Sequence, residues 1–267
     1  MGKALLFRSL HDSAHPLALA NAWDVVSARV IEAAGAPAIA TTSAGVAWSL
    51  GHPDGETLSP DRVVDLIARI VAAVDVPVTV DIEGGYGRDA AAVAGTVARV
   101  LEAGAVGINI EDGTRPPAEL RARLTAARVA AERAGASLFL NARTDTYPFG
   151  LGDRATRLED TLERARGYVD AGADGIFVPG VTDPATIAEL AAGIPAPLNI
   201  MAGPGAPDVA ELGHLGVARV SLGPGVAQTA YTATRHAAQQ LYDTGDHRPL
   251  ADAIPFPELD GLFPNPC

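Results

Sequence analysis

The sequence predicts an α/β protein, a single (β/α)8 TIM-type barrel over residues 1–267. One unit recurs along the chain: a helical stretch ends in Ala-Gly or Leu-Gly, and a short apolar strand with a polar or Gly-rich tip follows, as in "LEAGAVGINIEDG". The strands are continuously apolar, which is typical of parallel strands covered by helices. Eight such units of about thirty residues make a barrel. The alternative, a doubly wound open sheet, is disfavoured because no G-x-G-x-x-G follows the first strand.

Each expected strand has its own local signal. The first, third and seventh are short apolar runs, and the third is rich in Val and Thr, at 16–22, 76–82 and 196–201. The other five follow a glycine that suits the left-handed position after a helix, at 37–42, 105–110, 137–143, 174–178 and 217–222. A helix is expected after every strand, the last at 225–243. The Pro-rich tail, residues 255–267, is expected to pack on a neighbouring subunit.

Charge and composition exclude several classes of protein. The net charge is −12 and the pI is near 4.8, and such an acidic surface repels nucleic-acid phosphates and anionic lipid. The single lysine, Lys3, and the single cysteine, Cys267, argue against a Schiff-base enzyme, a P-loop, a zinc cluster and thiol catalysis. No apolar run reaches transmembrane length and no signal peptide is recognised, so we expect no membrane partner and a cytoplasmic location.

Charged side chains gather at the expected carboxyl ends of three neighbouring strands, where barrel enzymes place their chemistry. Asp81 and Glu83 end the third strand, Glu111 ends the fourth, and Asn141 and Arg143 end the fifth. Because side chains alternate along a strand, Asp81 and Glu83 are expected to face the same way, as are Asn141 and Arg143. Unpaired carboxylates this close repel one another, and a divalent cation relieves the repulsion. Oxygen ligands without Cys or His favour Mg²⁺ or Mn²⁺.

Some of these residues have structural alternatives. Asp24 and Asp112 suit helix caps or ion pairs, Arg143 could form a salt bridge to Glu111, and His52 suits the surface. The convergence of acids and an arginine on three adjacent strands is harder to explain by structure alone. We interpret the three glycines of "DIEGGYG" as leaving room for a substrate and allowing unusual backbone angles.

Five segments, in this order, resemble the isocitrate lyase/phosphoenolpyruvate mutase superfamily over about residues 15–240. They are "ANAWDVVSARVIEAAG", "TTSAGVAWSLGHPD", "VDIEGGYG", "INIEDG" and "NARTD". The resemblance implies an α/β barrel, a bound Mg²⁺ and 2-oxo-acid or enolate chemistry. It also implies a homotetramer, a dimer of dimers, that exchanges the last barrel helix between subunits.

The resemblance further implies roles for single residues. Asp81 matches the direct metal ligand, and Glu83 matches a second acid that holds the metal or its water. Asp54 and Glu111 match the remaining acids around the metal. Arg143 matches the arginine for the substrate carboxylate, and we expect it to act in catalysis with Asp54 and Glu111. The remaining expected substrate contacts are Thr42, Ser43, Ala44 and Asn141.

Three departures from the family's pattern affect the expected reaction. The lyases carry a Lys-Lys/Arg-Cys-Gly-His gating segment after the fourth strand, and the phosphonate-forming mutases carry a lysine-asparagine one. Residues 113–119 contain neither segment and are too short for a full lid. A glutamate of the lyases is replaced by Gly180. We therefore expect the loop at 48–60, which carries Asp54, to close the site.

These features predict a Mg²⁺-dependent carbon–carbon lyase that acts on a small 2-oxo or 2-hydroxy carboxylic acid through an enolate, by C–C cleavage or decarboxylation. Without the family's Cys and Lys, the proton donor would be metal-bound water, Tyr86 or His52. Two alternatives stay open: a phosphoenolpyruvate mutase-type P–C rearrangement, and a non-catalytic barrel that binds a 2-oxo acid.

Overall fold

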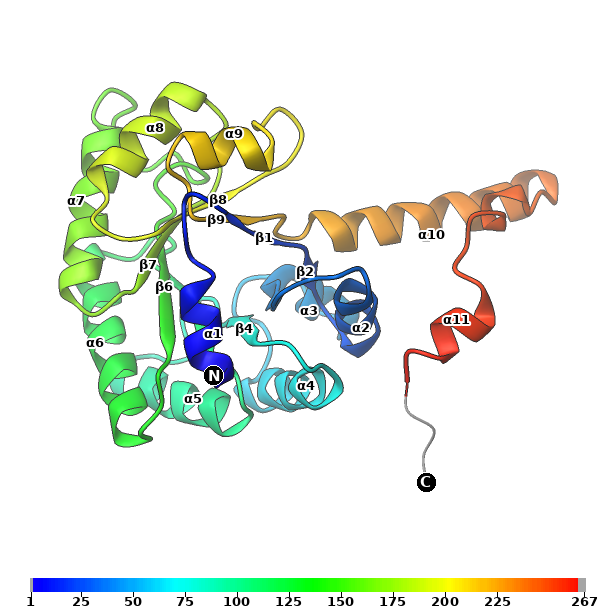
Figure 1. Ribbon diagram of the computed structural model, residues 1–267, viewed down its shortest axis with the longest axis horizontal. Helices are drawn as coiled ribbons and strands as arrows, with labels where there is room; N and C mark the ends of the chain where they lie inside the picture. The colour runs from blue at the N-terminus through cyan, green and yellow to red at the C-terminus, as the bar shows by residue number, and fades with distance from the viewer. Residues whose placement is uncertain (1, 264–267) are drawn as a thin grey trace.

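The computed structural model describes residues 2–263, and its strands form one parallel sheet that closes on itself (Figure 1). β1 and β2 are the two halves of the expected first strand; β1 pairs with β9 and β2 with β3, so the sheet becomes a barrel. The predicted (β/α)8 barrel is confirmed. The strands described are β1 (Leu17–Leu19), β2 (Asn21–Ala22), β3 (Ile39–Thr41), β4 (Val78–Asp81), β5 (Gly107–Glu111), β6 (Phe139–Arg143), β7 (Gly175–Val178), β8 (Leu198–Met201) and β9 (Arg219–Ser221).

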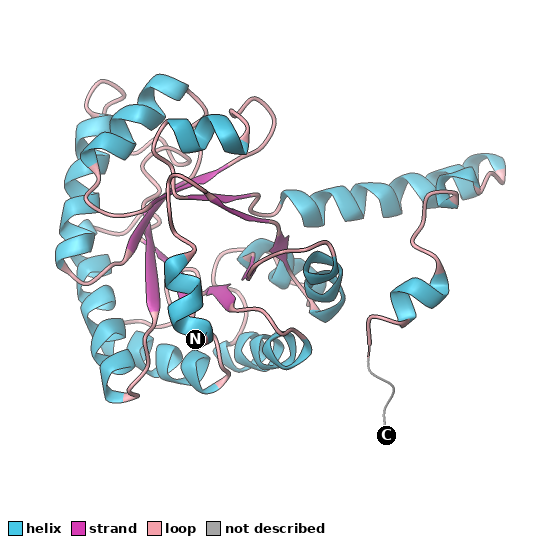
Figure 2. Cartoon of the chain, in the orientation of Figure 1, coloured by secondary structure: helices cyan, strands magenta, loops and turns pink. Residues whose placement is uncertain are grey.

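Helices surround the strands as an outer ring (Figure 2). The glycines expected at helix ends are left-handed, for example Gly35 with φ of 96° and Gly172 with φ of 107°. Asp24 caps α2 by accepting a hydrogen bond from the Ser27 backbone N–H, which is the structural role weighed for it. The helices are α1 (Lys3–Ser9), α2 (Val25–Ala33), α3 (Ser43–Ser49), α4 (Pro60–Ala73), α5 (Ala90–Glu102), α6 (Pro117–Arg133), α7 (Arg157–Asp170), α8 (Pro184–Gly193), α9 (Val209–His214), α10 (Gly225–Thr244), the 3₁₀ helix η1 (Arg248–Leu250) and α11 (Phe256–Asp260).

The barrel interior has a small apolar core of its own, separate from the large one between sheet and helices. Phe7 of α1 is fully buried in it and packs edge-on against Phe139, with ring centroids 5.6 Å apart. The ring of His11 stacks on Phe139 at 4.0 Å, and its Nδ1 lies 2.9 Å from the Phe7 carbonyl oxygen. Burial, followed by the charge of Arg219, lowers the pKa of His11 to about 3. His11 is therefore a neutral part of the interior at physiological pH.

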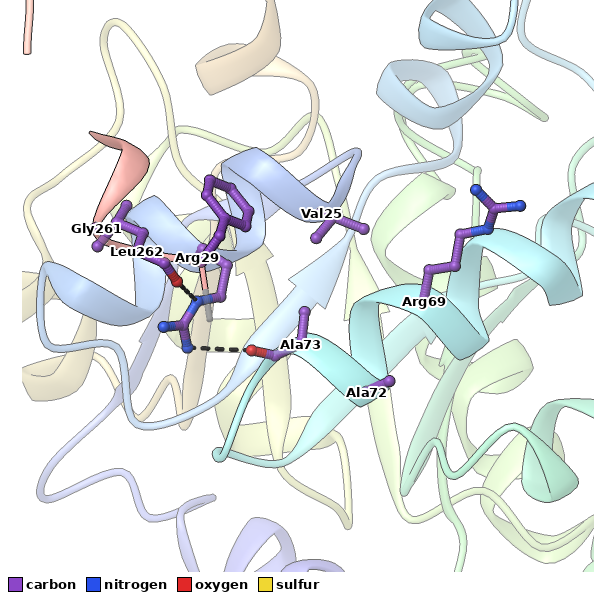
Figure 3. Close-up of a pocket in the computed structure, with 8 residues that line it drawn as sticks. Val25, Arg29, Arg69, Ala72, Ala73, Gly261 and Leu262 are labelled. Carbon is purple, nitrogen blue, oxygen red and sulfur yellow. Dashed lines mark hydrogen bonds between the residues drawn. The ribbon is translucent and has the colours of Figure 1, made fainter. Parts of the chain in front are cut away.

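The C-terminal part of the chain leaves the barrel and returns to it. α10 extends outward past the ring of helices, and the chain then turns back, so that α11 lies below the outer half of α10 in this view (Figure 1). The carbonyl oxygen of Leu262 accepts a hydrogen bond of 2.7 Å from Nε of Arg29 on α2 (Figure 3). The described part of the Pro-rich tail thus contacts α2 of its own chain, while residues 264–267 lie outside the described residues. Within residues 2–263, no helix is both long and apolar enough to cross a membrane.

Candidate active site

The carboxyl ends of the strands open onto a cavity of about 190 Å³. A larger hollow of about 650 Å³ lies outside the barrel, between α2, α4 and the tail (Figure 3), but only arginines supply charge there. The cavity at the strand ends brings together carboxylates, an arginine and backbone N–H groups, and it holds six of the predicted site residues. These are Thr42, Ser43, Ala44, Asp54, Asp81 and Arg143.

Asp81 ends β4 and is held in place by its neighbours. Its backbone N–H donates to Oγ1 of Thr41 at 2.9 Å, and its Oδ2 accepts from the Ser43 hydroxyl at 3.2 Å. Asp54 reaches the same cavity from the loop between α3 and α4. Partial burial of the Asp54 carboxyl group, together with the charge of Asp81, raises the pKa of Asp54. Two carboxyl groups from different elements therefore share one small space.

Arg143 is fixed on one side and paired on the other. Its Nε and Nη2 each lie 2.7 Å from Oδ1 of Asp145, and its Nη1 lies 2.7 Å from Oε2 of Glu111. Burial would lower the pKa of Arg143, but Glu111 and Asp145 raise it overall, so the guanidinium keeps its charge. Burial raises the pKa of Glu111 well above its usual range in spite of Arg143. The Arg143–Glu111 salt bridge weighed from the sequence is present.

Asp112 anchors this arrangement from behind. It is fully buried and accepts hydrogen bonds from the Asp145 backbone N–H at 2.8 Å, the Tyr168 hydroxyl at 2.6 Å and the Arg164 guanidinium at 2.8 Å. Asp112 does not line the cavity, in agreement with a structural role. Through Asp145 it sets the position of Arg143.

Glu83 lies behind the cavity wall, contrary to the alternation argument. β4 ends at Asp81, and the backbone of Glu83 is left-handed with φ of 51°, so the strand's alternation stops before this residue. Its Oε1 accepts from the Tyr86 hydroxyl at 2.6 Å, and its Oε2 accepts from the Glu56 backbone N–H. Burial raises the pKa of Glu83. Its contact with Asp81 runs through its own backbone N–H, which donates to Asp81 Oδ1 at 3.0 Å.

The glycines beside these acids do not leave room for a substrate, so that interpretation is wrong. A Cβ on Gly84 would lie 2.5 Å from Nη1 of Arg115, and one on Gly85 would lie 2.8 Å from the Val93 side chain. The space is filled by the protein itself. The expectation of unusual backbone angles is confirmed at Gly85, where φ is 103°.

Asn141 lies one layer below the cavity. Its Nδ2 donates to Oδ1 of Asn109 at 2.9 Å and to Oδ1 of Asn199 at 3.0 Å, and its side chain does not line the cavity. Beneath these amides, Arg219 is buried and donates to Asn109 at 3.3 Å. Burial lowers the pKa of Arg219 to about 10. Asn109, the direct register partner of Asn141 on β5, lines the cavity, as does Asn21 of β2.

The two side chains proposed as proton donors also lie outside the cavity. Nε2 of His52 lies 2.8 Å from Nη1 of Arg62, on the outer side of the loop. The Tyr86 hydroxyl donates to Glu83, and burial, followed by that charge, raises the pKa of Tyr86 beyond its usual range. Of the titratable acids, Asp54 and Asp81 are the ones that line the cavity.

Several residues that line the cavity were not predicted from the sequence. Phe177 of β7 lies under the guanidinium of Arg143, with Cζ 5.8 Å from the ring centroid, and Met201 and Ser221 follow on β8 and β9. Strand alternation, extended beyond the charged strand tips, would have indicated all three as inward-facing. Because apolar and hydroxyl side chains do not by themselves indicate catalysis or metal binding, the sequence did not single out these three residues.

The donor set suits a hard cation that prefers oxygen ligands, such as Mg²⁺. Within residues 2–263 no three Asp, Glu, His or Cys side chains form a preformed cage. Mg²⁺ is usually held by one or two carboxylates and keeps several waters, so it does not require such a cage. Asp81 and Asp54 supply two carboxylates at the cavity wall, and a cation between them would relieve their mutual repulsion.

The fold and the cavity define a TIM-barrel protein with an acidic site, completed by one arginine, at the carboxyl ends of its strands. The chain belongs to the phosphoenolpyruvate phosphomutase family, whose model matches residues 7–242. The resemblance to the isocitrate lyase/phosphoenolpyruvate mutase superfamily is thereby confirmed.

Two relatives illustrate the family. An uncharacterized protein of Mycobacterium tuberculosis (strain H37Rv) is 42% identical over 253 residues, which cover 95% of this chain and 94% of that protein. An oxaloacetate decarboxylase of Bradyrhizobium sp. (strain ORS 278) is 30% identical over 247 residues, covering 91% and 83%.

Two solved structures are similar throughout the fold. A provisionally assigned phosphonomutase of Burkholderia cenocepacia J2315 has a TM-score of 0.86 and 45% identity, and the match covers 89% of this chain and 99% of that one. Phosphonopyruvate hydrolase in complex with oxalate and Mg²⁺ has a TM-score of 0.84 and 26% identity, covering 98% and 95%.

Proposed function

We propose that this protein is a Mg²⁺-dependent carbon–carbon lyase that acts on a small 2-oxo or 2-hydroxy carboxylic acid. The observation that carries the proposal is the cavity of about 190 Å³ in which Asp54, Asp81 and Arg143 meet. Lys, Cys and His are missing from the described residues that line it, so the walls offer acid, hydroxyl and guanidinium groups. Two proteins similar to this chain support the substrate class. One is an oxaloacetate decarboxylase, and the other is a phosphonopyruvate hydrolase whose structure contains oxalate and Mg²⁺.

Arg143 binds the substrate carboxylate in this proposal. Asp145 holds Nε and Nη2, which orients the guanidinium and leaves Nη1 directed toward Glu111 at 2.7 Å. A substrate carboxylate that takes over Nη1 releases Glu111. The backbone N–H groups of Ser43 and Ala44, at the start of α3, receive the other anionic end of the substrate, while the N–H of Thr42 donates to the Ala22 carbonyl oxygen at 3.0 Å and Thr42 contributes its side chain to the cavity wall.

Asp81 is the direct metal ligand in this proposal, with Asp54 and Glu111 around it. Glu83 acts through its backbone contact with Asp81, since both of its carboxylate oxygens are engaged elsewhere. Bound Mg²⁺ would supply Lewis-acid polarisation of the substrate's keto oxygen. Mn²⁺ is a second candidate with the same preference for oxygen ligands.

Asp54 carries the proton in this proposal. Its carboxyl group lines the cavity, and the described residues that line the cavity include no Lys, Cys or His that could supply the proton instead. In a decarboxylation, the bond between the substrate carbon and its carboxylate breaks, carbon dioxide leaves, and the electron pair remains on the enolate. Asp54 then donates its proton to that carbon, and solvent restores the acid.

The test is a steady-state assay of the purified protein with oxaloacetate, with Mg²⁺ and with EDTA. We expect carbon dioxide release that EDTA abolishes and that Arg143→Lys reduces by roughly a hundredfold, because a lysine cannot pair with Asp145 and at the same time present a fixed N–H to the substrate carboxylate. Arg99→Ala, which removes a surface ion pair with Asp61, is the matched control and should leave the rate unchanged. Metal-independent release would contradict the proposal.

A phosphoenolpyruvate mutase-type rearrangement is the second candidate, favoured by the similarity to the Burkholderia protein. The same assay with phosphonopyruvate distinguishes it, because phosphoenolpyruvate would appear without a loss of carbon. Binding of oxalate without turnover of either compound would favour a non-catalytic barrel.

The proposal extends to the whole protein. We propose one barrel domain over residues 1–267, a homotetramer built from dimers, and a cytoplasmic location. The assembly is supported by the exposed apolar side chains of α10.

A further inference from the structure

Three strained residues meet beside the cavity. In the described chain, the non-glycine residues with positive φ are Glu56 at 56°, Glu83 at 51° and Tyr86 at 50°. They are hydrogen-bonded to one another: the Glu56 N–H donates to the Glu83 carboxylate, the Tyr86 N–H donates to Oε1 of Glu56 at 2.9 Å, and the Tyr86 hydroxyl donates to Glu83. Strained residues of this kind persist only where the surroundings determine the conformation, and they cluster at functional sites.

Arg115 joins this cluster from the short segment after β5. Its guanidinium forms an ion pair with Oε2 of Glu56. It also lies directly on Gly84, where an added Cβ would come within 2.8 Å of three guanidinium atoms. Arg123 of α6 is buried and donates to the Gly84 carbonyl oxygen from below. Two arginines therefore clamp the turn that follows Asp81, and one of them reaches across to Glu56.

Glu56 also makes contacts that hold the loop that carries Asp54. Residues 50–59 have no helix or strand, and Asp54 stands two residues before Glu56. At the start of this loop, the His52 N–H donates to the Ala47 carbonyl oxygen at 2.9 Å, which holds it to α3. At the other end, Leu58 is buried in the core. Between these two anchors, contacts of Glu56 hold the loop to the turn after β4 and to Arg115, so Glu56 supplies the polar contacts nearest to Asp54 along the chain.

We propose that Glu56 and Arg115 are positioning residues, a latch that holds Asp54 over the cavity in the place of the family's longer gating segment. The inference rests on the proposed function, because it assigns Asp54 the proton. The latch joins the loop after α3 to the segment after β5, and the turn after Asp81 lies between them. Breaking it should leave the barrel intact but let the loop of Asp54 move.

The first test is amide hydrogen exchange of the full chain, which does not depend on turnover. In Arg115→Ala we expect exchange within residues 50–59 to become roughly tenfold faster, while the barrel strands exchange as in the wild type. Gly84→Ala should give the same result, because φ of Gly84 is not positive and its new Cβ displaces the guanidinium of Arg115. Arg99→Ala is the control and should change nothing in this loop.

The second test is the kinetics of oxaloacetate decarboxylation. Both latch variants should lose about tenfold in kcat with little change in KM, because Arg143 still binds the carboxylate while Asp54 is misplaced. Arg115→Lys should recover part of kcat by keeping the ion pair to Glu56.

The two tests separate the latch from the proposed function. Wild-type exchange at residues 50–59 in both Arg115→Ala and Gly84→Ala would overturn the latch whatever the activity. Faster exchange at residues 50–59 with an unchanged kcat would also overturn the latch, since the reaction would then not depend on how firmly the loop holds Asp54. A wild-type protein without decarboxylase activity would overturn the proposed function, while the exchange result would still decide whether the latch holds the loop.

Discussion

His11 and Arg219 are two titratable groups inside one barrel, and the burial of His11, together with the charge of Arg219, makes folding sensitive to acid through His11. The pKa of His11 is about 3 in the folded chain and about 6.5 when unfolded. Between these values the unfolded state binds more protons, so stability is complete above pH 6.5 and falls as the pH drops toward 3. The loss is up to about 1.4 kcal/mol per pH unit for one proton.

The prediction is that His11→Phe unfolds with a weaker dependence on pH than the wild type between pH 6.5 and 4. The phenyl ring can stack on Phe139 as the imidazole does, at 4.0 Å, but it binds no proton. Urea unfolding followed by circular dichroism gives the free energies. His214→Phe, a change at an exposed position, should keep the wild-type slope, and equal slopes for all three proteins would contradict the assignment to His11.

A second prediction at this scale concerns Asp81. Asp81→Asn keeps the shape and the hydrogen bond from Ser43 but removes the charge that would hold Mg²⁺. We expect Mg²⁺ affinity to fall by at least about a hundredfold, with an unchanged melting temperature in EDTA. Calorimetric titration measures the affinity, and Asp61→Asn on the outer surface is the control. Wild-type affinity in Asp81→Asn would remove this residue from the metal site.

Single residues also show where inference from sequence stops. Asp54, Asp81 and Arg143 could be placed at one cavity because charge at the tips of buried strands is conspicuous and the barrel brings those tips together. The direction of the Glu83 side chain could not be predicted, because it depends on hydrogen bonds to Glu56 and Tyr86. Glu56 is distant in sequence, and no local pattern indicates the left-handed backbone of Glu83. The filling of the space at Gly84 by Arg115 depends on a contact 31 residues along the chain (115 − 84).

At the scale of elements, the parallel strands could be predicted because each is apolar on both faces, and most follow a glycine that ends a helix and lead into a polar tip. The observed strands agree with the expected ranges to within about one residue at their carboxyl ends. The break of the first strand at Ala20 was not predicted, since it follows from pairing with two different neighbours, β9 and β3. α3 was also missed, because its seven residues directly follow β3 without a separating glycine.

The loop after α3 carries the prediction at this scale. Residues 50–59 hold Asp54 beside the cavity, whereas residues 113–119 are short and contain Pro116 and Pro117. We expect Mg²⁺ with oxalate to slow amide exchange in 50–59 much more than in 113–119. Oxalate with EDTA is the control and should have a smaller effect. Slower exchange confined to 113–119 would show that the other segment closes the site.

For the whole molecule, α10 is the conspicuous feature. Its first half is anchored, with Tyr231 lying 6.3 Å from the rings of both Trp23 and Trp48. Its second half extends past the barrel (Figure 1), and Leu241 and Tyr242 are 53% and 82% exposed. Apolar side chains on a projecting helix gain free energy when a second chain covers them.

We therefore predict a homotetramer in solution at micromolar concentration, measured by light scattering. The double change Leu241→Asp and Tyr242→Asp should lower the mass, because it places charge on the surface that another chain would bury. Phe149→Asp, at an exposed aromatic on the segment between β6 and α7, should leave the mass unchanged. A wild-type monomer would contradict the prediction.

A side chain at position 84 would occupy the space that the guanidinium of Arg115 now fills, and this restricts how the two positions can change during evolution. A lineage that gains a side chain at position 84 while it keeps the arginine at 115 passes through a crowded intermediate. Selection then favours a prior or simultaneous change at 115. Homologous chains are expected to have either glycine with arginine at these two positions or a larger residue at 84 without the arginine. The turn after β4 and the segment after β5 should therefore be inherited as a unit, although 31 positions (115 − 84) separate them.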